Sequence, residues 1–436
     1  MGAALKPHAS AVPIHHTAQQ QRSNKRGTVK EILLINVSGQ DKPGVTLAIT
    51  SALAQWDAQI LDIGQAVIHD TLALGILVEL TLEAAAHSAL RATINTAAAE
   101  QGVQVNFHSI APEDYAQWVE QQGKTRHIIT LLARHISAVH LQELTAIITR
   151  HGLNIDTVNR LSGRVSLEQM VAAEGGGSAC VEFSVRGMPA DLQALRADFM
   201  ELSGRLNIDV AFQRDTVYRR NRRLVCFDMD STLIEAEVID ELAKAAGVGE
   251  QVAEITEAAM RGELDFTQSF ARRMALLKGL DESVLAGIAA QLRITEGAEK
   301  LISSLKKLGY KTAILSGGFN YFGHYLQAKL GIDYVYANEL DIVDGKVTGE
   351  VKGIVVDGKR KAELLTMLAQ QEGIALEQVI AVGDGANDLP MLSVAGLGVA
   401  FRAKPLVKAS AEHAISNLGL DAILYLLGFR ERDKLL

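Results

Sequence analysis

The chain has 436 residues, of which 48% are hydrophobic and 22% are charged. These values are ordinary for a globular protein, and the length corresponds to about three domains. The formal net charge is −8, so the composition gives no general drive toward nucleic acid or an anionic membrane. The two cysteines, Cys180 and Cys226, are far apart and form no metal-binding pattern. They indicate a reducing compartment, and we expect a cytoplasmic protein.

Residues 1–28 are polar, rich in His, Gln and Ala, and lack the apolar stretch of a secretory signal. We predict that they form a disordered tail. The longest apolar stretches, such as "LALGILVEL", are too short to span a bilayer, so no membrane partner is expected.

Residues 31–110 are predicted to form a small α+β domain with the order βαββαβ. Its expected strands cover 31–37, 58–68, 72–80 and 103–110, and its expected helices cover 41–56 and 83–100.

The same order of elements returns in residues 126–212. The expected strands cover 126–133, 153–163, 179–187 and 207–213, and the expected helices cover 137–152 and 189–206. A Gly-rich stretch, "AEGGGSA", lies between two of these strands. The repetition predicts a tandem of similar domains.

The first strand-to-helix turn carries "DKPGV", residues 41–45. Gly44 allows close backbone approach there, and a helix N-terminus favours an anion such as a carboxylate. With this turn, both units resemble ACT domains, which sense amino acids. The resemblance implies an amino-acid effector near Asp41 and Gly44, and side-by-side pairing of sheets into a homodimer. The second unit has "RHISAVH" at the matching turn, without Gly or Pro. A pure packing or dimerisation role stays open for both units.

The segment 213–223, "QRDTVYRRNRR", joins the two halves and carries five arginines. It is short and isolated in an acidic chain, so we interpret it as a solvated linker and expect no nucleic-acid partner.

From residue 224 onward, apolar strands alternate with helices, which is typical of a doubly wound parallel sheet. The expected strands are 224–230, 311–318, 334–340, 378–385 and 396–401, and 339–351 reads as a hairpin turning at Asp344-Gly345. Ligands bind beyond the carboxyl ends of the strands in such sheets. Asp228, Ser316 and Asp384 each stand at such an end.

The stretch "LVCFDMDSTL", residues 224–233, places Asp228 and Asp230 where a buried strand ends. This pair alone is a weak signal, because a metal-binding or structural-turn interpretation accounts for about half of such matches. The chain continues with "SGG" at 316–318, a lysine, and "GDGANDLPM" at 383–391, and this ordered set is hard to obtain by chance.

The ordered set resembles the haloacid dehalogenase-like phosphatases, and residues 224–436 resemble the phosphoserine phosphatases among them. The resemblance implies that Asp228 is the nucleophile and forms an aspartyl-phosphate, while Asp230 donates a proton to the leaving group. It implies a Mg²⁺ cofactor held by Asp228, the backbone carbonyl of Asp230, and Asp384, because Mg²⁺ prefers oxygen ligands.

The resemblance also assigns phosphate contacts. Ser316 and Gly317 would hold phosphate oxygens, and Asn387 would hydrogen-bond the phosphate. Lys361 matches the phosphate-binding lysine, although its neighbours Lys359 and Arg360 compete for that role. Asp388 would hold metal-bound water or Lys361.

The stretch from about 235 to 300 is mostly helical and reads as a cap over the site. By resemblance, Glu237 binds the ammonium group of phosphoserine and Arg273 its carboxylate, with Arg272 as a rival. Met260 and Phe266 fit apolar contacts of the cap, or plain helix packing.

Taken with the resemblance, the sequence predicts Mg²⁺-dependent hydrolysis of O-phosphoserine to L-serine and phosphate, the last step of serine biosynthesis. Two alternatives stay open. One is another small-molecule phosphatase or a phosphomutase. The other is an amino-acid sensor whose hydrolase half is inactive.

Overall fold

The computed structural model describes residues 28–164, 166, 168, 177–261 and 263–433. The chain divides into two compact units, residues 1–123 and 124–436. The tail predicted over 1–28 lies outside the described residues, except for Thr28, where β1 begins.

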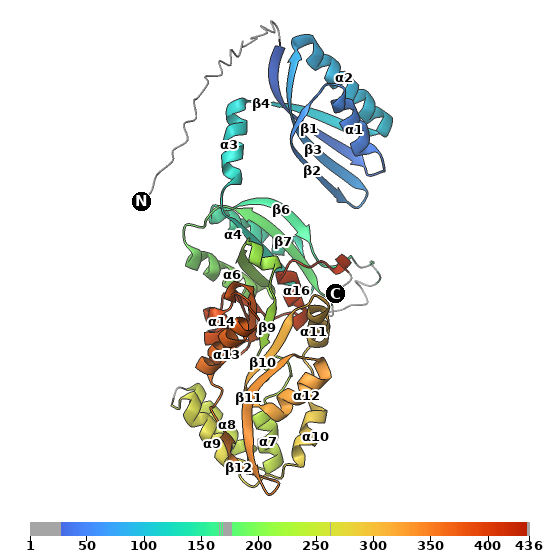
Figure 1. Ribbon diagram of the computed structural model, residues 1–436. Coiled ribbons are helices and arrows are strands. Elements are labelled where there is room, and N and C mark those ends of the chain that lie inside the picture. The colour runs from blue at the N-terminus through green and yellow to red at the C-terminus, as the bar shows by residue number, and fades with distance from the viewer. Residues whose placement is uncertain (1–27, 165, 167, 169–176, 262, 434–436) are drawn as a thin grey trace, which may run out of the picture. The chain divides into compact units, whose positions relative to one another are not determined.

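The first unit is a four-stranded antiparallel sheet in the order β2-β3-β1-β4 with two helices (Figure 1). Its elements are β1 Thr28–Gln40, α1 Val45–Ala54, β2 Gln59–Ile68, β3 Thr71–Glu83, α2 Ala84–Gln101 and β4 Val103–Ile110. Alternate residues of β3 are buried, and they form a core with Ile49 of α1 and Ile94 of α2. Helix α3, Pro112–Gln122, follows; it has no buried residue, and the sequence did not predict it.

The second unit begins with a repeat of this fold. Its elements are β5 Arg126–Ala133, α4 Ala138–Arg150, β6 Asn154–Arg160, β7 Ala179–Arg186, α6 Leu192–Leu206 and β8 Asp209–Arg214. The strand order β6-β7-β5-β8 matches that of the first sheet, so the predicted tandem is confirmed. Most of the Gly-rich stretch between β6 and β7 lies outside the described residues.

The rest of the second unit is built on a seven-stranded sheet in the order β12-β11-β10-β9-β13-β14-β15. The strands are β9 Leu224–Phe227, β10 Lys311–Phe319, β11 Tyr334–Val343, β12 Lys346–Lys352, β13 Val379–Gly383, β14 Leu397–Phe401 and β15 His413–Ile415. All neighbouring pairs are parallel except β11–β12. The predicted α/β class is confirmed.

Helices cover both faces of this sheet (Figure 1). The core helices are α11 Ala298–Lys307, α12 Asn320–Leu330, α13 Gly358–Gln371, α14 Leu389–Val394, α15 Pro405–Ser410 and α16 Ile423–Leu426, with short 3₁₀ turns at Val217–Arg220, Leu376–Gln378, Ala386–Asp388, Leu420–Ala422 and Glu431–Asp433. Strand β9 is buried on both faces, since Val225 and Phe227 join one core while Leu224 and Cys226 join the other.

The cap consists of α7 Val238–Ala246, α8 Gly249–Met260, α9 Phe266–Leu276 and α10 Val284–Gln291. Two segments join it to the core, 233–235 and 293–295, and we call them the cap hinge. They pair with each other: Glu235 N donates to Arg293 O at 3.0 Å, and Thr295 N donates to Leu233 O at 3.0 Å. The predicted hairpin is also present, with positive φ at Asp344 and Gly345.

The expectation of a solvated linker at 213–223 is wrong for two of its arginines. Arg219 is 1% exposed and is ion-paired with Glu182, while Arg222 donates to the carbonyl oxygen of Glu377 at 3.0 Å. The linker packs between the second ACT-like domain and the sheet, where buried guanidinium groups satisfy a carboxylate and a backbone carbonyl.

The second ACT-like domain shares a hydrophobic core with the phosphatase-like part. Leu132, Leu161 and Cys180 belong to the same buried cluster as Phe227. Asp209 also joins the two parts, because its Oδ2 accepts hydrogen bonds from the backbone of residues 416 and 417, both at 2.9 Å. Among the described residues, no helix has both the length and the apolar character needed to cross a membrane.

Candidate active site

Asp228 lies directly after β9, at the centre of the sheet. Its backbone N–H donates to Val382 O at 2.8 Å, which extends the parallel ladder by one residue. Its side chain is buried, and Oδ1 accepts a hydrogen bond from Met229 N at 2.7 Å. The parallel ladder therefore fixes this carboxylate at the carboxyl edge of the sheet.

Lys361 supplies the positive charge of the site. Its side chain is 0% exposed, with Nζ 2.9 Å from Asp228 Oδ2 and 2.7 Å from Asp388 Oδ1. Burial by itself would lower the pKa of Lys361, but the two carboxylates outweigh it and raise the pKa overall. Lys359 and Arg360 instead pair with Glu363 on the surface. Only the third of these neighbouring cations, Lys361, therefore reaches Asp228.

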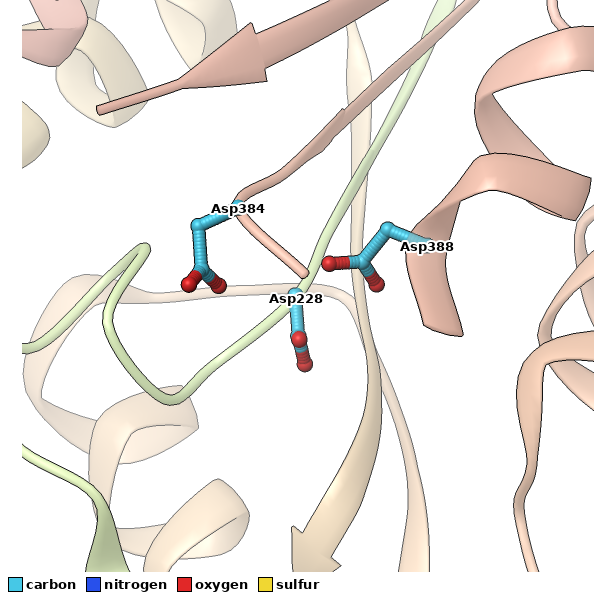
Figure 2. Close-up of side chains that lie close together, drawn as sticks. All are labelled: Asp228, Asp384 and Asp388. Atoms are coloured by element: carbon cyan, nitrogen blue, oxygen red, sulfur yellow. The ribbon is translucent and has the colours of Figure 1, made fainter. Parts of the chain in front are cut away.

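Three carboxyl groups converge at this edge. Asp228, Asp384 and Asp388 have oxygens within 4.8 Å of one another, and Figure 2 shows their side chains gathered around the ends of β9 and β13. Burial, together with the neighbouring carboxylates, raises the pKa of Asp384 and of Asp388 to about 7. Such crowding is unfavourable without a compensating cation, and clustered oxygen donors suit a hard divalent ion such as Mg²⁺.

Asp230 faces the same space from the loop after β9. Its Oδ1 accepts a hydrogen bond from Val238 N at 3.2 Å, and a Cβ on Gly318 would lie 2.5 Å from its Oδ2. Burial, and then the charges of Glu237 and Asp228, raise the pKa of Asp230 well above its usual range. Asp230 is therefore suited to carry a proton, whereas Asp228 is paired with a lysine.

Ser316 and Gly317 lie in the last part of β10, where its pairing with β11 shifts register between Leu315 and Phe319. Ser316 is fully buried, and its Oγ accepts a hydrogen bond from Gly318 N at 2.9 Å. Asn338, 2% exposed on β11, donates to Gly317 O at 2.8 Å and accepts from Val356 N at 2.8 Å. The amide thus ties the last part of β10 to the segment that leads into α13 and Lys361. The sequence analysis missed Asn338, whose only signal is an amide inside an apolar strand.

Glu237 and Arg273 come from the cap side. Glu237 Oε1 accepts a hydrogen bond from Ser231 Oγ at 2.6 Å, and Ser231 has a left-handed φ of 53°. Arg273 is half-buried; burial lowers its pKa, while the charges of Asp240, Glu237 and Asp230 oppose this. Its neighbour Arg272 is exposed. The sequence analysis also missed Ser231, because φ is not visible in a residue name.

Phe266 connects the cap to Gly317 in the last part of β10. Its Cζ lies 3.3 Å from the position that a Cβ on Gly317 would take, and its ring stacks on Phe270 at 6.0 Å between centroids. The side chain of Met260 lies outside the described residues. Asn387 places Oδ1 2.3 Å from where a Cβ on Gly385 would be, so a larger residue at 385 would have to displace the Asn387 side chain.

A separate cavity of about 350 Å³ lies in the first unit. It surrounds the turn before α1 and is lined by Asp41, Lys42, Gly44, Thr46 and Gln65 among others. Gly44 has φ of 101° at the N-terminus of α1, and Thr46 Oγ1 donates to Gln65 Oε1 at 2.8 Å. The turn singled out in the sequence therefore borders an open cavity.

Comparison with known proteins agrees with this architecture. A model described as haloacid dehalogenase-like hydrolase matches residues 222–396, and an ACT domain model matches residues 31–108. The sheet, the cap and the acidic site thus define a haloacid dehalogenase-like hydrolase preceded by ACT-type domains.

Relatives extend over nearly the whole length. The phosphoserine phosphatase of Streptomyces coelicolor is 40% identical over 92% of this chain and 93% of its own length. Phosphoserine phosphatase SerB2 of Mycobacterium tuberculosis is 40% identical over the same shares. A crystal structure of a probable phosphoserine phosphatase from Vibrio cholerae matches 71% of this chain and 87% of its own, at 34% identity and a TM-score of 0.54. The chain belongs to the phosphoserine phosphatase family.

Proposed function

We propose that this chain hydrolyses O-phosphoserine to serine and phosphate through an aspartyl-phosphate on Asp228. The observation that carries the proposal is that two carboxyl groups in different environments, Asp228 and Asp230, lie at the carboxyl edge of the sheet. Asp228 contacts the buried ammonium of Lys361, whereas the raised pKa of Asp230 favours its protonated form. One group is thus suited to attack phosphorus and the other to donate a proton.

In the first step, an Asp228 oxygen attacks phosphorus, and Asp230 gives its proton to the serine oxygen as the P–O bond breaks. In the second step, Asp230 takes a proton from the attacking water, and the bond between Asp228 and phosphorus breaks. Lys361 stabilises the anionic phosphate oxygens near Asp228, together with Ser316, the Gly317 N–H and Asn387.

The cluster of oxygen donors fits Mg²⁺. Asp228, Asp384 and the backbone carbonyl of Asp230 would hold the ion, with Asp388 supporting Lys361 from behind. When bound, Mg²⁺ would screen the repulsion between the nucleophilic carboxylate and the phosphate dianion. Burial and neighbouring carboxylates raise the pKa of Asp384 and Asp388. A bound cation would offset the repulsion among these carboxylates, which supports this assignment.

Substrate recognition would come from the cap. We propose that Glu237 binds the ammonium of phosphoserine and Arg273 its carboxylate, since Arg suits carboxylate geometry. The charges of both residues act on the same group, Asp230, which supports a place for them beside the leaving serine.

The direct test measures phosphate release from phosphoserine with Mg²⁺ and with chelator, for the wild type and Asp228→Asn. We expect Mg²⁺-dependent release, loss of turnover in the variant, and an unchanged circular dichroism spectrum. Trapping of labelled phosphate on another residue would overturn the mechanism. A phosphomutase would transfer phosphate to a second substrate, and a sensor would release none.

We further propose that the cavity of the first unit binds a small amino acid as an effector. The N–H groups at the start of α1 would face its carboxylate, and Asp41 its ammonium. Calorimetry with serine and glycine should show binding to the wild type and its loss in Gly44→Val. Valine is strained at φ of 101°, so this change distorts the turn.

A homodimer, a cytoplasmic location and a place at the end of serine biosynthesis complete the proposal. Edge strand β2 leaves Ile60, Ile63 and Ile68 exposed, which supports pairing between sheets. Both cysteines are free and buried, which supports a reducing compartment.

A further inference from the structure

A series of ion pairs runs from the second ACT-like domain to the cap hinge. Arg134, directly after β5, donates from Nη1 and Nη2 to the two carboxylate oxygens of Glu296, each at 2.8 Å. Glu296 directly follows the hinge segment 293–295. This contact joins residues 162 positions apart in the chain and has the bidentate geometry that restricts orientation most.

The series continues through the core to the other hinge segment. Arg402 donates from Nη2 to Glu296 Oε2 at 2.6 Å, and its Nη1 lies 3.9 Å from Glu235 Oε1. Arg293 Nε lies 3.8 Å from Glu235 Oε2. Glu235, at the end of one hinge segment, and Glu296, directly after the other, are thus each contacted by arginines. We call Arg134, Glu296, Arg402 and Glu235 the hinge ion-pair series.

The core end of this series is firmly fixed. Arg402 has a left-handed φ of 44°, which is uncommon for a residue with a side chain, and its N–H donates to Ile415 O at 2.7 Å. Glu296 O accepts a hydrogen bond from Leu420 N at 2.8 Å. A Cβ on Gly297 would lie 2.3 Å from Asp421 Oδ1, so the chain is closely packed where it leaves the hinge.

The cap end carries recognition groups. Glu237 lies two residues after Glu235, and Arg273 comes from the cap helix α9. Rotation about the hinge would move both relative to Asp228, which stays fixed at the end of β9. A small shift of the hinge therefore becomes a change in how well the cap closes over the substrate.

We propose that Arg134 is a positioning residue for the phosphatase reaction, acting from the second ACT-like domain through Glu296 on the cap hinge. The inference rests on the proposed phosphoserine hydrolysis for its kinetic consequence, but the hinge itself can be observed without turnover. If the closed cap binds substrate best, weakening the hinge ion-pair series lowers the population of that state and raises KM, while kcat stays nearly constant.

The test compares three arginine-to-alanine variants in the full chain. Arg134→Ala breaks the contact with the hinge. Arg196→Ala breaks an ion pair with Glu412 at 2.6 Å, which joins the same two parts of the unit away from the hinge. Arg205→Ala breaks an ion pair with Glu143 at 2.9 Å, inside the second ACT-like domain. Arg196→Ala controls for a general weakening of the contacts between the two parts, and Arg205→Ala controls for a weakening within the second ACT-like domain.

We expect Arg134→Ala to raise KM for phosphoserine about three- to tenfold with kcat within about twofold, because a partly exposed ion pair biases an equilibrium only modestly. The backbone amides of Glu235 and Thr295 each donate a hydrogen bond across the hinge. In Arg134→Ala, their hydrogen exchange should be faster by about the same factor as the rise in KM. Arg134→Lys keeps the charge but loses the second parallel bond, so it should fall between. Added NaCl should raise KM of the wild type more than that of Arg134→Ala.

Equal hinge exchange and equal KM in Arg134→Ala and the two controls would overturn the proposal. If Arg134→Ala does not fold, Glu296→Gln tests the same contact from the core side and must give the same split between KM and kcat. If Arg134→Ala speeds hydrogen exchange at the hinge but neither the wild type nor any variant hydrolyses phosphoserine, the role of Arg134 at the hinge stands and the proposed substrate is rejected. If the proteins hydrolyse phosphoserine but Arg134→Ala leaves hinge exchange unchanged, the proposed substrate stands and the role of Arg134 is rejected.

Discussion

Replacement of Lys361 by methionine tests whether charge balance holds the candidate active site together. Methionine keeps much of the volume but removes the ammonium that contacts Asp228 and Asp388 at 2.9 and 2.7 Å. Both carboxylates then stay buried without their cation. Removal of one partner from a buried ion pair costs about 3–5 kcal/mol in the free energy of unfolding, mainly through the uncompensated charge that remains.

The cost should depend on pH in a definite direction. With Lys361 present, burial and Asp228 raise the pKa of Asp388 to about 7, above its value in the unfolded chain. Between those two pKa values the folded state holds a proton that the unfolded state lacks, so stability falls as pH rises toward 7. Without the ammonium, which lowers the pKa of Asp388, the repulsion between the carboxylates is uncompensated, and this fall continues to higher pH. The loss in Lys361→Met should therefore be largest near pH 8 and smaller near pH 5.5.

The assay is urea unfolding of the metal-free protein at both pH values, with Lys359→Met as the matched control. Lys359 is 85% exposed and lies 3.9 Å from Glu363, so its replacement should stay within about 0.5 kcal/mol of the wild type. An equal loss at pH 8 and pH 5.5 would refute the charge-balance argument and point to simple packing. A loss below about 1 kcal/mol at pH 8 would show that water already compensates the carboxylates.

Three further predictions concern substrate recognition, the last part of β10 and acid stability. Arg273→Ala should lower kcat/KM for phosphoserine by about 10- to 150-fold through loss of a charge-assisted contact, and should affect an aryl phosphate far less; equal losses on both substrates would remove Arg273 from carboxylate binding. Asn338→Leu should cost about 2–4 kcal/mol of stability and reduce kcat, because the part-buried Gly317 carbonyl and the buried Val356 N–H lose their partner, whereas Asn338→Asp should keep the bond from Val356; chemical denaturation with kinetics would contradict this if both variants behaved alike. Burial, assisted by nearby Arg222, lowers the pKa of His413 to about 4, so below pH 6.5 the unfolded chain gains a proton that the folded chain does not, and up to about 3 kcal/mol of stability is lost on going down to pH 4. His413→Gln should flatten this acid dependence in unfolding measured across pH, and parallel curves for the two proteins would argue against it.

Much of the candidate site could be predicted because its polar side chains lie at or just beyond the ends of apolar strands. A short apolar strand followed by Asp228, or by Asp384, can be read directly from the sequence, and the parallel sheet then brings these ends together. The helix start was less accurate: the first helix begins at Val45 rather than near Asp41, because Gly44 adopts a left-handed conformation. Local sequence patterns thus predicted the helices and strands and the carboxyl edge of the sheet that carries the site, but they did not predict the backbone conformations inside turns.

Contacts between distant segments were beyond the sequence. Nothing near Arg134 indicates Glu296, and nothing in "RRNRR" separates the buried Arg219 and Arg222 from their exposed neighbours. Charged residues are usually solvated, so that was the reasonable expectation for the linker. Burial of an arginine depends on a partner such as Glu182, whose place is set only by the tertiary fold.

The buried contacts change what the second ACT-like domain can be. A domain joined by a solvated linker would be free to move and could influence the phosphatase part only through collisions or a shared ligand. Here Leu161 and Cys180 lie in the same hydrophobic cluster as Phe227, one residue before Asp228, and Arg219 fixes the linker to β7. A change in the packing of this domain therefore acts on groups already in contact with the catalytic sheet and, through Arg134, on the cap hinge. Because packed cores shift between discrete arrangements rather than deform continuously, the second domain is better regarded as part of the catalytic unit than as an attached sensor.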